Sequence, residues 1–242
     1  MINKNNTILP LPYSISALNE TALLVSFENI IDENINDKVI ALAHSMQENN
    51  FKGFIETVPA YNSLAIFYDM AIVKKCHASL QTAFEFVKNF TEEQIRTIQP
   101  VKKDGTKAIN IPVYYNGEDL AAIAAEKQLP VEELIRIHTS MSYRVYMIGF
   151  LPGFAYMGKV DERIAVPRLS SPRTNVNAGS VGIAGFQTGI YPLQSPGGWQ
   201  LIGQTPVKIF DTQKNDPCLL KAGDSVQFIS ITKEAFEKLN EY

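Results

Sequence analysis

The sequence predicts an α+β protein in two parts: a small two-layer domain of split βαβ type, then a β-barrel or β-sandwich. Glycine is the first indication, because residues 1–100 contain only Gly53 while the other 13 of the 14 glycines lie beyond them. The second is a change of pattern, from helical spacing of apolar residues to short β-type runs separated by Gly and Pro. We place the domains at 1–100 and 101–242.

In the first part, a short apolar run at 22–27 predicts a buried strand. A helix follows, because Val39, Ile40, Ala43 and Met46 recur at helical spacing. Residues 53–58 and 63–68 predict two strands that pair, and residues 80–90 a second amphipathic helix. The order strand, helix, strand, strand, helix is that of a split βαβ domain.

The second part opens with alternating apolar residues at 107–114, which predict a strand. Two short helices follow at 117–127 and 130–138, the second beginning at a proline. Beyond them, β-type runs predict strands at 143–150, 181–186, 205–210 and 225–232. Several short strands between turn residues are typical of a barrel or sandwich.

Composition excludes several classes of function. The 22 basic and 25 acidic residues give a net charge of -3, which argues against non-specific electrostatic binding to nucleic acid or to an anionic membrane. Two cysteines, Cys76 and Cys218, are too few for a disulfide framework and too isolated for a metal cluster. No run approaches the roughly 20 apolar residues of a membrane span. We expect a cytoplasmic protein without a metal centre.

The helix pair between 119 and 138 has two interpretations. It could be a DNA-reading helix-turn-helix, which would present basic and amide side chains from its second helix. Residues 116–140 instead carry five acidic residues against Lys127 and Arg136, a charge that repels phosphate. This balance favours a structural helical hairpin.

A loop at 149–158 interleaves three glycines with three aromatic residues. Such glycines allow amides to point at an anion while the rings form a wall, although a tight barrel corner has the same composition. We assign to substrate binding five residues of this loop: Gly149, Phe150, Pro152, Gly153 and Tyr156.

Arg168 and Arg173 each follow a proline, five residues apart. The planar guanidinium fork suits a carboxylate or a phosphate, so two of them on one stiff loop could clamp an acidic substrate. Ordinary surface arginines are the alternative.

Residues 174–207 contain no charged side chain. An uncharged, Gly-rich and Pro-rich stretch with aromatic anchors suits a ligand cleft or a partner interface, whereas barrel core with turns is the structural alternative. We assign Gln187 to substrate binding. The residues assigned to a partner interface are Tyr191, Pro196, Gly197, Gly198, Trp199 and Thr205.

His138 ends the second short helix, and it could serve as a general base in catalysis. A histidine stabilised by the helix dipole at that end is the alternative.

Three long motifs carry a resemblance to a known family. They are Tyr143-x-Val145-x-Met147-x-Gly149-Phe150-x-Pro152-Gly153-Phe154-x-Tyr156, Ala178-Gly179-Ser180-Val181-x-Ile183-Ala184-Gly185, and Ser195-Pro196-Gly197-Gly198-Trp199-x-Leu201-Ile202-Gly203-x-Thr205. With the paired Pro-Arg, they strongly resemble the allophanate hydrolase subunit 1 family, whose members are also called 5-oxoprolinase B subunits or KipI.

The resemblance implies that the second domain is a cyclophilin-like β-barrel, although no cyclophilin active-site signature is present. It implies one subunit, inactive alone, of an ATP-dependent hydrolase that opens 5-oxoproline to glutamate together with a larger KipA-like C subunit and an A subunit. Because the sequence has no Walker motif, we expect ATP to be shared with or bound by the partner. Alternatives within the family are an inhibitor of a sporulation histidine kinase and an allophanate or urea-related hydrolase subunit.

Overall fold

The computed structural model describes residues 12–77, 82–98 and 108–241. The chain divides into two compact units, residues 1–102 and 103–242, each with its own hydrophobic core. The domain boundary proposed from the sequence falls within 99–107, outside the described residues. Among the described helices, none is long and apolar enough to cross a membrane.

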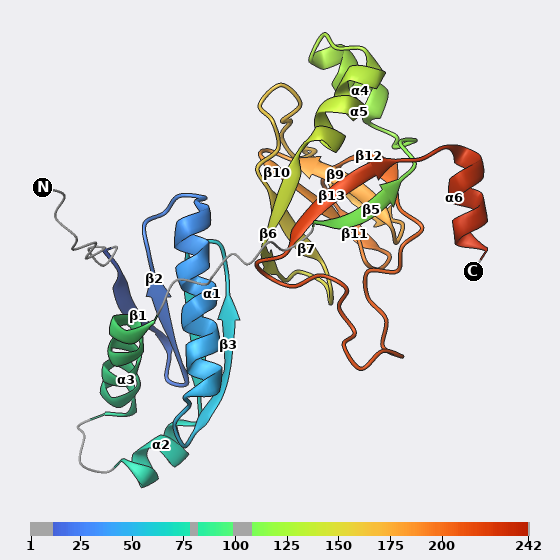
Figure 1. Cartoon of the computed structure of the whole chain (residues 1–242). Coiled ribbons are helices and arrows are strands. Elements are labelled where there is room, and N and C mark those ends of the chain that lie inside the picture. Colours follow the sequence, from blue (N-terminus) through green and yellow to red (C-terminus); the bar gives the residue numbers. More distant parts are fainter. Residues whose placement is uncertain (1–11, 78–81, 99–107, 242) are drawn as a thin grey trace, which may run out of the picture. The chain divides into compact units, whose positions relative to one another are not determined.

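The first unit is a four-stranded antiparallel sheet with helices packed against it (Figure 1). Its elements are β1 (Ser14–Asn19), β2 (Ala22–Ser26), α1 (Glu33–Glu48), β3 (Phe54–Pro59), β4 (Ser63–Tyr68), α2 (Met70–Cys76) and α3 (Ala83–Thr97). β2 and β3 both pair antiparallel with β4, so they run parallel to each other with β4 between them. Since α1 connects β2 to β3, the predicted split βαβ unit is confirmed.

Local signals explain where α1 begins and which face it buries. The Asp32 carboxylate accepts hydrogen bonds from the amides of Asn34 (2.8 Å) and Ile35 (3.1 Å), a cap that stabilises a helix by about 1 kcal/mol. Residues at i, i+3 and i+7 then turn toward the sheet and are fully buried: Val39, Leu42 and Met46.

The second unit is built around a seven-stranded sheet. Its elements are β5 (Ile109–Val113), α4 (Leu120–Glu126), α5 (Val131–Ser140), β6 (Ser142–Ile148), β7 (Ala155–Gly158), β8 (Arg173–Val176), β9 (Ser180–Ala184), β10 (Gln187–Ile190), β11 (Ser195–Gly197), β12 (Gln200–Gln204), β13 (Ser225–Ser230) and α6 (Lys233–Asn240). The strand order is β12-β9-β10-β7-β6-β13-β5, and β8 pairs with β11 in a separate ribbon.

The seven-stranded sheet curls into a nearly closed barrel, as the sequence predicts. Tyr114, directly after β5 at one edge, exchanges two 2.9 Å backbone hydrogen bonds with Gln204 of β12 at the other edge. Inward side chains such as Val145, Ile183 and Phe228 are fully buried and fill the interior.

The two predicted short helices are confirmed as α4 and α5, which lie together at one end of the barrel (Figure 1). Both are part of the barrel core, because Leu120, Ile123, Leu134 and Ile137 are at most 5% exposed. This placement is that of the structural hairpin.

The predicted strand at 205–210 is wrong. The chain leaves the sheet after β12, and only a single bridge between Phe210 and Cys218 remains in that segment. Pro206 has no amide to donate, and the Thr205 hydroxyl accepts a hydrogen bond from the Val207 amide (3.2 Å), which turns the backbone locally.

Candidate functional site

Four aromatic side chains gather outside the barrel interior and form what we call the aromatic cluster: Phe154, Tyr156, Tyr191 and Trp199. The Phe154 ring meets the rings of Tyr191 and Trp199 edge-on, with both centroid distances at 5.3 Å. Tyr156 completes the cluster, with its centroid 4.9 Å from Phe154 and 5.8 Å from Trp199. The fold thus brings together the 149–158 loop, which contributes Phe154 and Tyr156, and the uncharged 174–207 segment, which contributes Tyr191 and Trp199.

Two glycines of the uncharged run are needed because these rings lie against the backbone. A Cβ at Gly189 would stand 2.9 Å from the carbonyl oxygen of Ala155 and 3.0 Å from the Trp199 ring. A Cβ at Gly197 would clash with the Tyr191 ring. Close packing therefore accounts for part of the glycine content, which from the sequence alone suits a ligand cleft or a partner interface.

Tyr191 and Trp199 are only 1% and 2% exposed, so their rings belong to the core of this chain. The Thr205 hydroxyl group and amide are likewise engaged within the chain, and Gly197 and Gly198 are buried. Pro196 is the exposed member of the predicted interface set. A partner interface at this place stays a prediction. Because Tyr191 and Trp199 are buried, they would hold the interface backbone in place and would not contact the partner directly.

The loop between β6 and β7 uses three of its amides internally and presents one exposed aromatic ring. The amides of Gly149, Leu151 and Phe154 donate to carbonyls within the loop, at 2.9 to 3.1 Å. Phe150 has a left-handed backbone (φ 70°), which is unusual for a bulky residue, and its side chain is 61% exposed. Gly153 also has positive φ (80°) and is buried, while Pro152 is exposed.

The exposed Phe150 ring lies beside the aromatic cluster, with its centroid 5.6 Å from that of Phe154 and the two planes at 87°. An accessible aromatic surface therefore extends from the buried cluster. Gln187 begins β10 and lies at the opposite end of that strand from Tyr191.

The two arginines have different environments. Arg173 is 20% exposed, and its guanidinium donates to the carboxylates of Asp119 (2.6 Å) and Glu118 (3.3 Å) and to the carbonyl of Trp199 (3.4 Å). Asp119 also accepts a hydrogen bond from the Leu201 amide at 2.6 Å. Arg173 therefore ties β8 to the start of α4 and to β12.

Arg168 is exposed, and its guanidinium forms no hydrogen bond or ion pair with the part of the chain that the structure describes. Its loop is nevertheless held on both sides: Leu169 donates to the carbonyl of Gly198 (2.8 Å), and Gln200 donates to that of Pro167 (3.3 Å).

The charge of Arg168 acts on the aromatic cluster. Burial raises the pKa of Tyr156 and of Tyr191, and the Arg168 charge opposes the rise in both. The Arg168 charge is therefore near Tyr156, and Phe150 adjoins the same aromatic cluster through Phe154. We group Arg168, Phe150 and Tyr156 under the name Arg168 surface. This combination suits a small anionic ligand with an apolar part.

His138 lies inside the barrel rather than on the Arg168 surface. Its ring is 0% exposed and stacks on Phe228, with centroids 4.7 Å apart. Nε2 lies 3.0 Å from the hydroxyl of Thr188, which itself donates to the Gly182 carbonyl, so Nε2–H is the donor. Nδ1 accepts from the hydroxyl of Tyr115 at 2.7 Å. With both nitrogens engaged and no exposure, this position argues against a general base.

Burial also lowers the pKa of His138, from 6.5 to about 3. Below pH 6.5, His138 therefore binds a proton in the unfolded chain but stays neutral in the folded chain. The stability that the neutral His138 contributes is present above pH 6.5 and is lost as pH falls toward 3. We expect His138→Gln to flatten the acid dependence of unfolding by about 1.4 kcal/mol per pH unit below pH 6.5. Denaturant unfolding followed by the fluorescence of Trp199, the only tryptophan, measures it. If the free energy of unfolding changed with pH equally in both proteins, the lowered pKa of His138 would be contradicted.

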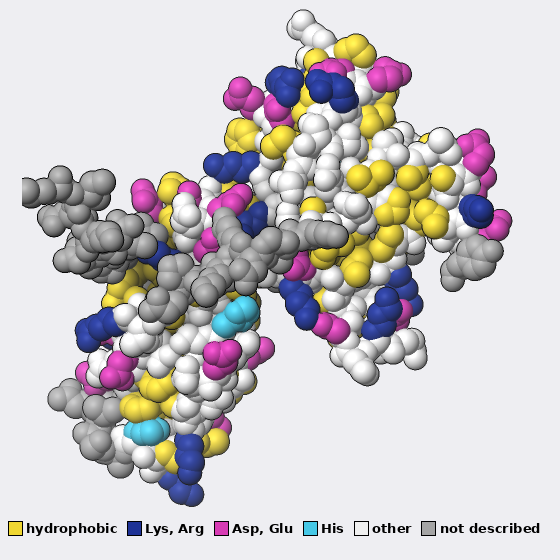
Figure 2. All heavy atoms as spheres, in the orientation of Figure 1, with side chains coloured by type: hydrophobic (Ala, Val, Ile, Leu, Met, Phe, Trp, Pro, Cys, Tyr) yellow, Lys and Arg dark blue, Asp and Glu magenta, His cyan; other side chains and the backbone are white. Residues whose placement is uncertain are grey.

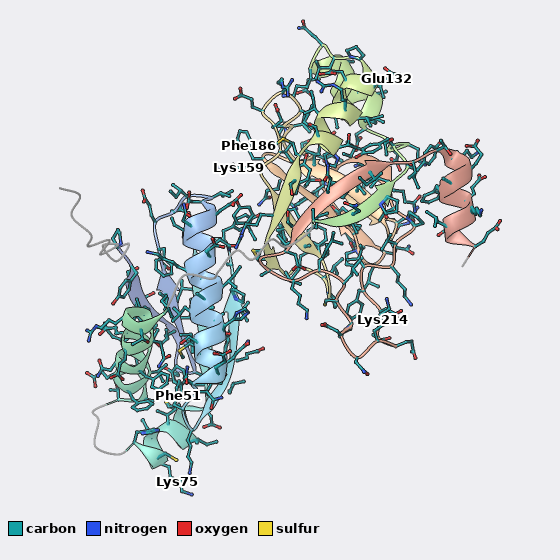
Figure 3. The ribbon with its side chains drawn as sticks, in the orientation of Figure 1. Phe51, Lys75, Glu132, Lys159, Phe186 and Lys214 are labelled. Carbon is teal, nitrogen blue, oxygen red and sulfur yellow. The ribbon has the colours of Figure 1, made fainter. Side chains whose placement is uncertain are left out.

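Sequence reasoning missed several residues that matter here. In the sequence, Glu118 and Asp119 are simply acidic residues of a helical hairpin, because their link to Arg173 spans more than fifty positions. Phe186 lies in the hairpin between β9 and β10 and is 55% exposed. It lies near Lys159 (Figure 3), and the Val160 amide donates to the Phe186 carbonyl. The described residues include no group of three or more His, Cys, Asp or Glu side chains placed to hold a metal ion.

Residues 13–220 match the family model described as "Carboxyltransferase domain, subdomain C and D". The chain is 45% identical over 233 residues to the 5-oxoprolinase B subunit of Bacillus subtilis (strain 168), covering 95% of this chain and 97% of that protein.

Two solved structures are also similar. TTHA0988 matches with a TM-score of 0.76 and 32% identity, over 87% of this chain but 40% of that longer chain. The conserved protein PH0987 from Pyrococcus horikoshii matches with a TM-score of 0.53 and 41% identity, over 92% of this chain and 100% of that one.

Proposed function

We propose that this chain, which belongs to the family of carboxyltransferase subdomains C and D, is the B subunit of an ATP-dependent 5-oxoprolinase. The observation that carries the proposal is the 45% identity to the Bacillus subtilis B subunit, which extends over 95% of this chain and 97% of the relative. A match over the whole length of a protein of the same size supports the same role in a complex.

The reaction opens the lactam of 5-oxoproline to glutamate, with ATP converted to ADP and phosphate. A lactam carbonyl is a poor electrophile, and transfer of the γ-phosphoryl group of ATP to its oxygen makes it reactive. Water then attacks that carbon, the ring C–N bond breaks and the nitrogen takes up a proton, which leaves an acyl phosphate at the former lactam carbon. A second water attacks this acyl phosphate and releases phosphate and the new carboxylate of glutamate. Negative charge develops at the reacting oxygen, and the substrate carries a carboxylate throughout.

We assign Arg168 to the anionic part of the substrate, because its guanidinium is exposed and makes no ion pair within the described chain. Phe150 and Tyr156 supply the neighbouring apolar surface. Arg173 receives no such role, since its donors already serve Asp119, Glu118 and Trp199.

ATP is proposed to lie mainly on the partner. The sequence has no Gly-Lys-Ser/Thr phosphate loop, and three amides of the glycine-containing 149–154 loop are used within the loop. The proposed partners are the larger C subunit, which is KipA-like, and the A subunit.

Reconstitution tests the proposal. We expect the three purified subunits together to release glutamate and ADP from 5-oxoproline and ATP in equal amounts, and this chain alone to release neither. Full activity of the C and A subunits without this chain would overturn it, and so would an assembled complex without turnover.

Inhibition of a sporulation histidine kinase stays a prediction of the family resemblance. Autophosphorylation of the kinase with and without this chain would measure it.

A further inference from the structure

Helix α6, near the C-terminal end of the chain, is amphipathic, but none of its residues is fully buried. It begins after Thr232, whose hydroxyl accepts a hydrogen bond from the Ala235 amide at 3.3 Å. Its apolar residues share one face, Ala235, Phe236 and Leu239, and its four charged residues lie on the other. Among the described helices, α6 is the one without a buried residue.

The apolar face of α6 continues onto the barrel. Ile229 of β13 pairs in register with Pro112 of β5, and both point out of the barrel, since the alternate residues Phe228 and Val113 are fully buried. One step further, the Tyr114 ring lies 5.9 Å from the ring of Phe236. We call this region the β13–α6 surface, comprising Pro112, Tyr114, Ile229, Phe236 and Leu239.

Figure 2 shows hydrophobic side chains gathered over β13 and β5, next to α6 and bordered by charged side chains. Ile229 is 40% exposed and Leu239 is 51% exposed. An apolar centre with a charged rim is the usual anatomy of a protein interface.

An eight-residue helix is too short to be stable in water by itself, because isolated helices need roughly 12–15 residues to become even marginal. Its packing on the barrel is limited to partly buried side chains such as Phe236 on Tyr114. The remaining stabilisation would come from a surface that covers Leu239 and Ile229.

We propose that the β13–α6 surface docks the larger subunit of the hydrolase. This inference rests on the proposed function. Its support is the comparison of two relatives: the Bacillus subtilis protein is a separate chain of this length called a subunit, whereas TTHA0988 contains this fold as 40% of a longer chain. In TTHA0988 this fold is joined covalently to the rest of a longer chain, whereas a separate subunit is held to its partner through a surface of its own.

The test uses calorimetry to measure the affinity of the full chain, tagged at its N-terminus, for the purified larger subunit. Ile229→Glu and Leu239→Glu each place a carboxylate in the apolar centre, and we expect each to weaken binding about tenfold or more and the double variant to abolish co-purification. Asn240→Glu is the matched control, since it adds the same charge one residue further along α6, outside the apolar face. It should bind within about twofold of the unmodified chain.

Leu239→Glu is informative even if Ile229→Glu folds poorly, because α6 buries no residue and Leu239 is half exposed. Binding of a folded double variant within about twofold of the unmodified chain would overturn the proposal. The proposal would also be overturned if light scattering showed that the unmodified chain self-associates and the variants lost only this self-association. The β13–α6 surface would then bind a second copy of this chain. An unmodified complex that forms but releases no glutamate would instead contradict the proposed function and leave this surface in place.

Discussion

Replacing Arg168 by alanine lowers kcat/KM of the assembled 5-oxoprolinase by about thirtyfold or more. Loss of a charge-assisted hydrogen bond to an anionic group costs about 2 kcal/mol, and that energy converts to about thirtyfold in rate. Arg168→Lys keeps the charge but loses the planar fork, so we expect it to recover only part of the activity. Steady-state glutamate release in the three-subunit assay gives the comparison.

Arg163→Ala is the matched control for Arg168. Arg163 is an exposed arginine of the same unit, but it pairs with Asp161 at 2.7 Å and lies 4.0 Å from Glu133. Its replacement should leave turnover unchanged. Near-normal turnover of both Arg168 variants would rule out the substrate role, and failure of those variants to assemble would move Arg168 to the subunit interface.

Asp119→Ala is expected to destabilise the second unit by about 3 kcal/mol, because breaking a largely buried ion pair leaves the other charge unsatisfied. The Asp119 side chain is 13% exposed and that of Arg173 is 20% exposed. The substitution also leaves the Leu201 amide without its 2.6 Å acceptor. Denaturant unfolding followed by Trp199 fluorescence measures the change inside this unit.

Two comparisons make the result specific to the pair. Glu118→Ala removes the other carboxylate of Arg173, but Glu118 is 74% exposed, so we expect a change below about 0.5 kcal/mol. Adding Arg173→Met to Asp119→Ala should restore part of the lost stability, since no charge is then left unpaired. Equal effects of Glu118→Ala and Asp119→Ala would contradict this account.

The elements predicted from the sequence are those whose pattern is repeated along the chain. Helix α1 shows helical spacing of its buried residues over about three turns, from Ile35 to Met46, and β4 alternates buried and half-buried residues, so both are visible in the sequence. Strand β1 was missed because it is an edge strand with five of its six residues exposed, which leaves no apolar period. β7, β8, β10 and β11 have three or four residues each, too few for a period to register.

For the candidate site, residue type and spacing identified the segments but not the environment of each side chain. Arg168 and Arg173 have the same local sequence, Pro-Arg, and nothing near them distinguishes one from the other. The difference is made by Asp119, which meets Arg173 because the start of α4 lies beside β12 and β8. His138 similarly becomes a buried neutral group only because Thr188, fifty positions away, lies beside it.

The sequence by itself determined the two-part α+β organisation, the split βαβ unit and the family, because these depend on periodicity, glycine distribution and long motifs that are local in the chain. Only the tertiary structure decided that Trp199 and Tyr191 are core residues, that Arg168 rather than Arg173 keeps its guanidinium accessible, and that α6 leaves an apolar face uncovered. Burial and charge pairing are set by contacts between residues far apart in sequence, and a linear pattern does not contain those contacts.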